Sequence, residues 1–360
     1  MNRIILSLLI STLCGAAGAA VLQVPADYPT IQGAVNAAQD GDEIQIVEGV
    51  YFETISISSR NNLTLAGKRK VIIDANGGGP GLLVAFSTGV TLKNLRVRNC
   101  AGNAAISLVA CGQIRVDRCR VSGVQGAGGI EVAGCLGVTI DRCRVKDVAL
   151  TGVDINAGGT VVRRTRITAP GKHGIQIWGG ANSAIDNRIT AAGEDGIVLG
   201  GDGGSCNAAL LAGNRIDLSG SKGIRFTEFA SACYAFDNHI HGGPTGLYVQ
   251  VSSDQHVLDG NIVRKTATRG LLLDGTDCLI SRNNLKKGGA IAGFTIAGDN
   301  NILSENRIRK MTTYGVEIYA CTGNAVIGNT VTGSGNFDLD DDTNPGDNSF
   351  VDNVFGTVKP

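Results

Sequence analysis

The sequence has few aromatic residues and no excess of charge of either sign. Aromatic residues make up 4% of the 360 positions, and 32 Lys and Arg balance 32 Asp and Glu. Because no net basic charge is present, nucleic acid is not an expected partner. Glycine, by contrast, fills 52 positions without the triplet period of collagen. This is too much glycine for an ordinary globular domain and indicates a repetitive backbone.

Long apolar runs are also lacking, which argues against a membrane span. The longest run lies in residues 1–20, where Arg3 precedes an apolar stretch and the small residues Ala17-Gly18-Ala19 follow it. This pattern is typical of a secretory signal peptide. We therefore expect residues 1–20 to be removed and the remaining chain to be secreted, periplasmic or at the cell surface. Nine Cys would then lie in an oxidising compartment, where disulfides are allowed.

Internal repetition is the strongest feature of the sequence. A glycine followed by alternating apolar residues recurs at intervals of 22 to 27 residues. These glycines are Gly129, Gly152, Gly174, Gly196, Gly223, Gly246, Gly270, Gly293 and Gly315. Leucine-rich repeats have a similar period, but their Leu-x-x-Leu-x-Leu pattern is absent. The spacing predicts an all-β, single-domain right-handed parallel β-helix over residues 21–360, with coils of about 22–24 residues.

A second repeated column lies half a coil away and is made mostly of asparagine. Its members are Asn187, Asn214, Asn238, Asn261, Asn284, Asn306, Asn329 and Asn353. Upstream, Cys100, Cys119, Cys143 and Thr165 take the same position. Stacked amides can bond along such a column. At the N-terminal end, residues 30–42 predict a short amphipathic capping helix, with Thr30 as its N-cap.

The chain resembles the pectin-lyase-like superfamily of right-handed β-helix proteins, including the NosD-type repeat group. Residues 24–57, with Gly49-Val50-Tyr51-Phe52-Glu53, are similar to the first coil of pectin methylesterases. The catalytic Gln-Asp, Asp-Phe and Gly-Arg-Pro-Trp stretches of those esterases are missing, so esterase activity is not expected. A copper-delivery role, which the NosD name suggests, has no support from a sequence with two Met and no His/Met/Cys cluster.

Two short stretches are also similar to polygalacturonases. Lys172-His173-Gly174 resembles their Gly-His-Gly, and Asp195-Gly196 resembles their Thr-Asp-Gly. The order differs, because in that family the Asp coil precedes the His coil and an Asp pair lies between them. Asp154 and Asp195, two coils apart, are a conceivable carboxyl pair for inverting hydrolysis. A polygalacturonase-like hydrolase is therefore the third of the functions considered.

Outward-pointing positions of the glycine-started strands gather polar residues in the middle coils. This strip contains Asp154, His173, Gln176, Trp178, Asp195, Lys222, Arg225, Tyr248 and Arg269. Val198 and Gly200 should leave a shallow dip between Trp178 and Arg225. An aromatic face and cations suit an acidic sugar, because the ring stacks and the cations bind a carboxylate. Asp154, Gln176, Trp178 and Arg269 are therefore the expected substrate-binding residues.

The first hypothesis is an enzyme that acts on an acidic polysaccharide by β-elimination or C5 epimerisation. Both reactions remove a proton next to a carboxylate, which Arg225 would neutralise. His173, or Lys222 with a lowered pKa, would be the base, with Asp195 beside it and Tyr248 as acid or base from the other side. The alternative is a noncatalytic β-helix that binds glycans or serves at the cell surface. Charged side chains there would then serve solubility alone, with His173 and Asp195 as a surface ion pair.

Equivalent positions on successive coils predict two disulfides, Cys111–Cys135 and Cys206–Cys233, because stacking places their Cα atoms within bonding range. No metal ligand set is recognised, and no cofactor is expected. Asp338 to Asp342 could hold calcium, although a solvated cap at the end of the last coil is the preferred interpretation. His239 and His241 match no zinc pattern, and the oligomeric state is left open.

Overall fold

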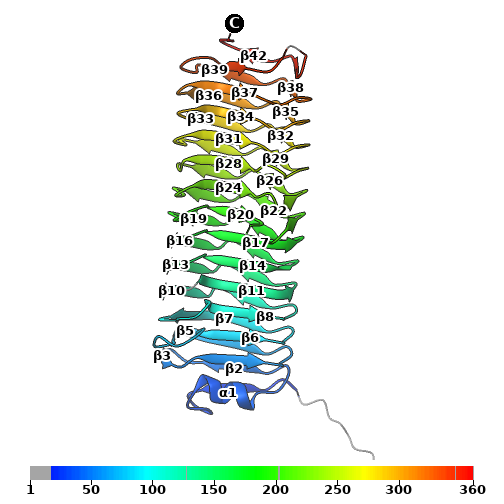
Figure 1. Cartoon of the computed structure of the whole chain (residues 1–360). Coiled ribbons are helices and arrows are strands. Elements are labelled where there is room, and N and C mark those ends of the chain that lie inside the picture. The colour runs from blue at the N-terminus through cyan, green and yellow to red at the C-terminus, as the bar shows by residue number, and fades with distance from the viewer. Residues whose placement is uncertain (1–17, 127, 202, 345, 360) are drawn as a thin grey trace, which may run out of the picture.

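The computed structural model describes residues 18–126, 128–201, 203–344 and 346–359. All but the last three residues of the expected signal peptide, 1–20, lie outside the described residues. The described chain forms a long stack of parallel strands with α1 at its N-terminal end (Figure 1). The predicted parallel β-helix is therefore confirmed. Among the described residues, no helix has the length and apolar character needed to cross a membrane.

The N-terminal end is closed by α1 (Ile31–Ala37), as the sequence predicted. Thr30 is its N-cap and accepts a hydrogen bond from the Gly33 N–H at 3.0 Å. The carboxylate of Glu53 accepts two more, from Ile31 and Gln32, each at 2.9 Å. These bonds satisfy donors that have no partner within a helix. Glu53, which belongs to the stretch that is similar to the first coil of pectin methylesterases, thus fixes the capping helix to the end of the solenoid.

The strands form three columns around the axis, which we name front, left and right after the places of their upper strands in Figure 1. The front column is one sheet and contains β4 (Ile55–Ser58), β6 (Leu82–Ala85), β8 (Ala104–Val109), β11 (Gly128–Leu136), β14 (Val153–Gly158), β17 (Ile175–Gly180), β20 (Ile197–Leu199), β24 (Lys222–Phe226), β28 (Thr245–Val249), β31 (Arg269–Leu273), β34 (Ala292–Ile296), β37 (Tyr314–Ile318) and β40 (Leu339–Asp341). Two short strands, β21 (Cys206–Asn207) and β25 (Ala230–Ser231), extend it locally.

The other two columns belong to one bent sheet, joined through the long strands β5 (Thr64–Asp74) and β7 (Thr91–Arg98). The right column contains β1 (Val21–Val24), β2 (Glu43–Ile46), β9 (Arg115–Asp117), β12 (Thr139–Asp141), β15 (Val161–Arg163), β18 (Ser183–Ile185), β22 (Leu210–Ala212), β26 (Tyr234–Phe236), β29 (Val257–Asp259), β32 (Leu279–Ser281), β35 (Ile302–Ser304), β38 (Ala325–Ile327) and β41 (Ser349–Val351). The left column contains β3 (Gly49–Phe52), β10 (Arg120–Val124), β13 (Arg144–Val148), β16 (Arg166–Pro170), β19 (Arg188–Thr190), β23 (Arg215–Asp217), β27 (His239–His241), β30 (Ile262–Arg264), β33 (Asn284–Gly288), β36 (Arg307–Met311), β39 (Thr330–Thr332) and β42 (Val354–Phe355).

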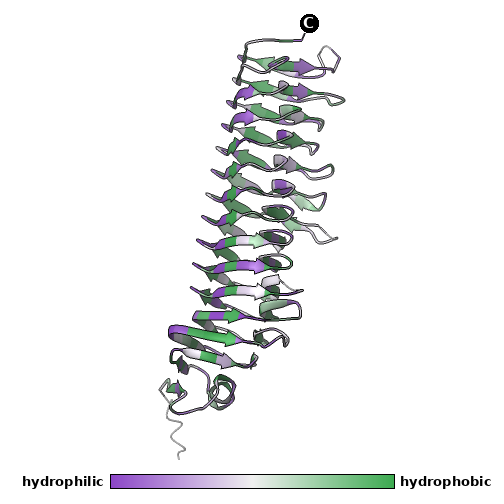
Figure 2. Ribbon diagram, turned by 90° about the vertical axis from the view of Figure 1, so that its left-hand side faces the viewer, coloured by the Kyte–Doolittle hydropathy of each residue, from purple (hydrophilic) through white to green (hydrophobic). Residues whose placement is uncertain are grey.

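The apolar core runs the length of the stack, and apolar strand segments recur in every coil (Figure 2). Val153, Ile175, Ile197 and Ile224 occupy one inward column of the front sheet, and none is exposed to solvent. The repeated glycines have a steric cause. A Cβ on Gly174 would lie 2.5 Å from the Gly196 carbonyl oxygen and from an Ile189 methyl group. Only glycine fits where the chain turns into the front sheet.

The asparagine column is confirmed as a continuous hydrogen-bonded ladder, with one correction. Asn238 Nδ2 donates to Asn261 Oδ1 at 3.0 Å, and the Asn238 N–H donates to the same oxygen, also at 3.0 Å. The next member is Asn283, whose Oδ1 accepts from Asn261 at 2.9 Å. The prediction of Asn284 was wrong, because Asn284 starts β33 and pairs outward with Ile262 and Arg307.

A second, shorter asparagine ladder runs where the chain leaves the front column. Asn301 N–H donates to Asn324 Oδ1 at 2.8 Å, and Asn324 N–H donates to Asn348 Oδ1 at 3.0 Å. Asn301 and Asn324 are buried. Sequence reasoning missed this ladder, because only its last three coils carry consecutive asparagines.

Candidate functional site

The outward column of the front sheet has the predicted register. Asp154 pairs with Gln176, Gln176 with Val198, Val198 with Arg225, and Arg225 with Tyr248. Equivalent residues therefore lie one strand spacing apart, roughly 4.8 Å. The order of the site residues along the solenoid axis thus follows directly from the repeat.

Asp195 is the centre of the polar contacts on this face and is only 2% exposed. Its Oδ2 lies 2.8 Å from Arg225 Nε, and its Oδ1 accepts a hydrogen bond from the Lys222 N–H at 3.0 Å. His173 lies on the other side, with Nδ1 3.6 Å from Asp195 Oδ2. The Arg225 expected to neutralise a substrate carboxylate thus contacts Asp195 through Nε, and its side chain is 27% exposed.

His173 is nearly buried, with 7% of its surface exposed, and it lies between two carboxylates. Its Nε2 is 3.4 Å from Glu194 Oε2, and its Nδ1 accepts a hydrogen bond from the Asp195 N–H at 3.4 Å. Burial lowers the pKa of His173, and this effect exceeds the opposite influence of the Asp195 and Glu194 charges. The imidazole is therefore neutral at neutral pH, as a general base must be.

A groove of about 160 Å³ opens beside His173. Asp154, Gln176 and Trp178 line it, as do Glu131 and Lys172. Glu131 is the neighbour of Asp154 on the preceding strand and accepts a hydrogen bond from Ser107 Oγ at 2.9 Å. Sequence reasoning did not assign Glu131, Lys172 or Glu194 to the site. Lys172 and Glu194 precede the two recognised motif residues directly, which was the available signal.

Trp178 lies differently from the prediction. Its indole N–H donates to the Gly200 carbonyl at 3.1 Å, and a Cβ on Gly204 would lie 3.2 Å from the ring. The glycine-rich turn that contains Gly200, Gly201 and Gly204 therefore packs against the indole. Val198 is fully buried. The expected dip is thus occupied by this turn, and one face of the indole is covered rather than open to a sugar.

Lys222, Tyr248 and Asp274 form a separate cluster farther along the axis. Lys222 Nζ lies 5.7 Å from the centre of the Tyr248 ring. Burial, together with the charge and hydrogen bond of Asp274, raises the pKa of Tyr248 to about 12. This hydroxyl is therefore a proton donor at neutral pH rather than a base. Arg269 is not brought to the groove, because its Nε donates to Thr295 Oγ1 at 2.9 Å.

The cysteines expected to pair are buried and present as free thiols, like all nine described cysteines. Cys111 and Cys135 have the predicted stacking, with the Cys111 N–H donating to Cys135 Sγ at 3.3 Å. Cys206 pairs in register with Ala230, so the assumed equivalence with Cys233 was wrong. Cys233 Sγ nevertheless lies 3.5 Å from the Cys206 carbonyl oxygen. Both disulfides remain predictions.

The aspartates of the last coil are engaged with protein groups. Asp338 accepts hydrogen bonds from the backbone of Ser334 and Thr357, at 2.9 and 3.0 Å. Lys359 Nζ lies 2.9 Å from Asp340 and 2.7 Å from Asp342. No group of three or more His, Cys, Asp or Glu suited to a metal ion occurs within the described ranges. The segment ties the C-terminal tail to the last coil.

The fold defines the class: the chain is a right-handed parallel β-helix protein. Residues 44–188 match the family model "Right handed beta helix region", and residues 219–359 match "Periplasmic copper-binding protein (NosD)". No curated protein sequence matches the chain significantly.

Several solved structures share this fold at low sequence identity. The A-module of mannuronan C-5 epimerase AlgE6 from Azotobacter vinelandii has a TM-score of 0.61 and 16% identity, covering 91% of this chain and 93% of that one. A mannuronic-acid-specific family 6 lyase from human gut microbiota has a TM-score of 0.62 and 13% identity, covering 86% of each chain. PfbA, a surface adhesin of Streptococcus pneumoniae, has a TM-score of 0.57 and 12% identity, covering 85% and 91%. At these identities the similarity establishes the fold alone.

Proposed function

We propose that this protein is an exported or periplasmic enzyme that binds an acidic polysaccharide in the groove beside His173 and cleaves it by β-elimination. The observation that carries the proposal is the state of His173. It lines the groove, its buried imidazole is neutral at neutral pH, and the Asp195 carboxylate lies 3.6 Å from its Nδ1. A neutral imidazole oriented by a carboxylate is a common general base.

The chemical step requires removal of the C5 proton next to the uronate carboxylate. His173 Nδ1 accepts a hydrogen bond from the Asp195 N–H at 3.4 Å, so the chemical step requires the other tautomer, in which the Nδ1 proton faces the Asp195 carboxylate 3.6 Å away and the Nε2 lone pair accepts the C5 proton. Lys172, which lines the same groove, supplies the positive charge that stabilises the developing carbanion. The C4–O4 bond then breaks, and the imidazolium returns its proton to the leaving oxygen. Arg225 acts only indirectly, since it holds Asp195 in place.

Elimination fits this geometry better than C5 epimerisation. Elimination on one side of the ring needs a single proton carrier, whereas epimerisation needs a second carrier on the opposite side. Tyr248, the expected second carrier, lies three strands beyond Gln176, roughly 14 Å along the axis. It cannot reach the sugar carbon that His173 reaches. The shared fold with a mannuronic-acid-specific lyase supports a uronate polymer as the substrate class.

A noncatalytic glycan-binding or cell-surface role is the second candidate. The contact between Asp195 and Arg225 and the covered face of Trp178 favour it, because both are features of a stabilised surface. The similarity of the fold to a surface adhesin is compatible with this role. In this case the groove would bind glycans without turning them over.

The deciding experiment uses polymannuronate, polyguluronate and polygalacturonate as substrates. We expect ultraviolet absorbance from an unsaturated product with at least one of them, and loss of at least about 100-fold in rate for His173→Gln. His239→Gln, an exposed histidine on the left column, is the matched control and should keep full activity. Retained binding without unsaturated product or C5 proton exchange would establish the noncatalytic role instead. Full activity in His173→Gln would rule out this site.

A further inference from the structure

A row of arginines runs along the left column, away from the front sheet. Each of six consecutive strands carries one arginine at the same register position, and each pairs in register with the next. The row consists of Arg96, Arg120, Arg144, Arg166, Arg188 and Arg215. Neighbouring members are one strand spacing apart, roughly 4.8 Å. In a protein whose total charge is zero, this places a straight line of positive charge on one edge of the solenoid.

The first four arginines of this row have no carboxylate partner in the part of the chain that the structure describes. Arg188 and Arg215 both contact Asp217, at 3.4 and 3.0 Å. By contrast, none of Arg96, Arg120, Arg144 and Arg166 forms an ion pair with any other described residue. Desolvation, and then the like charges of Arg96 and Arg144, lower the pKa of Arg120. Like charges directly opposite on adjacent strands are destabilising unless something neutralises them.

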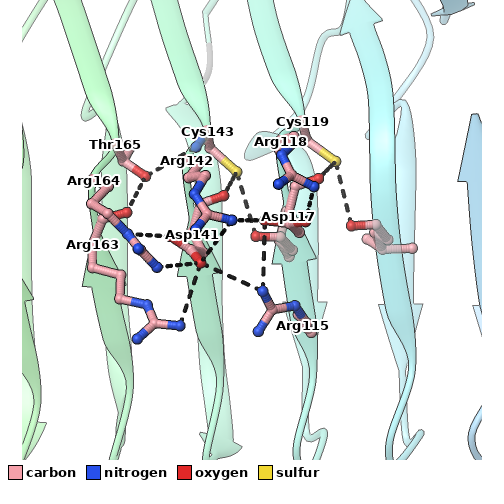
Figure 3. A network of polar contacts seen from close by, with 12 residues as sticks. Arg115, Asp117, Arg118, Cys119, Asp141, Arg142, Cys143, Arg163, Arg164 and Thr165 are labelled. Atoms are coloured by element: carbon pink, nitrogen blue, oxygen red, sulfur yellow. Dashed lines mark hydrogen bonds and ion pairs between the residues drawn. The ribbon is translucent and has the colours of Figure 1, made fainter. Parts of the chain in front are cut away.

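Two aspartates of the neighbouring strands β9 and β12 are already occupied by other arginines (Figure 3). Asp141 lies within 4 Å of four guanidinium groups, the closest being Arg164 at 2.7 Å. Asp117 contacts Arg118 at 3.2 Å and Arg115 at 3.7 Å. This neighbouring network therefore carries more arginines than aspartates, and it adds positive charge beside the row instead of cancelling it.

A pocket of about 160 Å³ lies at the N-terminal end of the row. Four arginines line it, namely Arg69, Arg96, Arg118 and Arg120, together with Asn94 and Leu95. No carboxylate is among its lining residues. Guanidinium forks that converge on an open space without an acid are suited to bind a carboxylate or a sulfate in bidentate fashion.

We propose that this arginine row, Arg96 to Arg166 with the pocket at its end, is a docking surface for a strand of acidic polysaccharide that runs parallel to the solenoid axis. A polyuronate carries one carboxylate on every sugar, so a line of evenly spaced guanidinium groups matches its repeating charge. The row spans three strand spacings, roughly 14 Å, which accommodates a short stretch of such a polymer.

Single-stranded nucleic acid fits this surface less well. Proteins that bind it combine basic grooves with aromatic side chains on which the bases stack. The strands of the row and its neighbours cover residues 91–98, 115–124, 139–148 and 161–170, and none contains Phe, Tyr or Trp. This face is therefore suited to a polymer that carries negative charge but has no nucleobases to stack.

This surface is independent of the proposed lyase site. The row lies on the left column, and the His173 groove lies on the front column. The row would retain the protein on its polymer, or feed a strand along it, whether or not the groove is catalytic. Failure of one proposal therefore leaves the other standing.

The test measures binding of polygalacturonate and polymannuronate by titration calorimetry at low and at physiological salt, with the full-length mature protein. We compare Arg120→Gln/Arg144→Gln with Arg307→Gln. Arg307 occupies the same column and is equally exposed, but its column neighbours are Asn284 and Thr330. We expect at least tenfold weaker binding and a shallower salt dependence for the double variant, and no change for Arg307→Gln.

Arg120→Lys/Arg144→Lys separates charge from the guanidinium fork and should show an intermediate affinity. The double glutamine variant should fold, because it removes repulsion, and an unchanged or raised Tm would confirm this. Unchanged polyuronate affinity in the double variant would overturn the proposal. It would also be overturned if a single-stranded oligonucleotide bound as tightly as a polyuronate of equal charge and lost affinity equally in the double variant.

Discussion

Asp195, which lies two residues before β20, holds Arg225 of the adjacent strand β24, with Oδ2 2.8 Å from Nε. Asp195 is almost completely buried, whereas the Arg225 side chain is 27% exposed. Asp195→Asn would leave the partly buried guanidinium without its carboxylate and should lower the free energy of unfolding by about 3 kcal/mol. Urea denaturation followed by circular dichroism measures this change. Arg282→Gln, which removes an exposed pair with Asp259, is the control and should have a much smaller effect, because solvent screens the exposed guanidinium. Equal effects of the two substitutions would contradict this interpretation.

The lowered pKa of His173 has a consequence for stability against pH. In the unfolded chain this group titrates near 6.5, whereas the folded state keeps it neutral to lower pH. Between these two pKa values the unfolded state binds the extra proton, so the free energy of unfolding falls as pH falls. The stability is complete above pH 6.5 and is lost progressively below it. Comparing denaturation midpoints of the native protein and His173→Gln across this window tests the sign; a steeper loss in the variant would refute it.

The asparagine ladder should tolerate change at its end but not in its middle. Asn238 is fully buried, donates to the Leu211 carbonyl at 3.0 Å and accepts from Asn214 Nδ2 at 2.9 Å. Asn238→Ala leaves the buried Leu211 carbonyl and the Asn214 amide without these hydrogen bonds, so it should lower the free energy of unfolding by about 3 kcal/mol. Asn353 ends the ladder and is only partly buried, so Asn353→Ala should cost about 1 kcal/mol. Thermal denaturation of both variants measures the difference, and similar Tm losses would show that the ladder does not act through burial.

The two predicted disulfides can be tested on protein recovered from an oxidising compartment. A hydrogen bond from the neighbouring Cys135 thiol lowers the pKa of Cys111 to about 6, which favours the thiolate that starts disulfide formation. A hydrogen bond with the Cys206 thiol likewise lowers the pKa of Cys233 to about 5. Peptide mapping without reduction should therefore identify a Cys111–Cys135 link and a Cys206–Cys233 link. Cys119 is the internal control, because burial raises the pKa of its thiol to about 12, and it should remain unlinked. Recovery of Cys111 and Cys206 as free thiols would exclude both links.

Much of the fold was predictable because the repeat determines register. The alternation of Gly174-Ile175-Gln176-Ile177 sets which side chains point inward, and the period then aligns Asp154, Gln176 and Arg225 without further information. The same reasoning was wrong by one residue at Asn283, because Asn283 and Asn284 are consecutive in the sequence and either could have been the member of the ladder.

The candidate site was less predictable, because the alternation of apolar and polar residues does not determine the contacts between turns and side chains on which the site depends. The glycine-rich turn near Gly200 sits in a coil longer than its neighbours, and it both covers Trp178 and displaces Cys206 from the register of Cys233. The engagement of Arg225 by Asp195 likewise depends on side-chain rotamers. The arginine row escaped notice because its members are 22 to 27 residues apart and are hidden by a neutral total charge.

The ladder column changes from cysteine to asparagine along the solenoid, and we expect the two parts to resist unfolding differently. Up to Cys143 the column carries thiols, and Cys119 Sγ makes only weak contacts, at 3.6 Å, with the carbonyls of Leu92 and Asp117. From Asn187 onward, an amide oxygen clamps two N–H groups of the preceding coil, as Asn214 does with Asn187 at 3.0 and 3.1 Å. Under a pulling force or a protease, the chain should unravel from its N-terminal third, while the amide-clamped coils stay wound as one stiff rod.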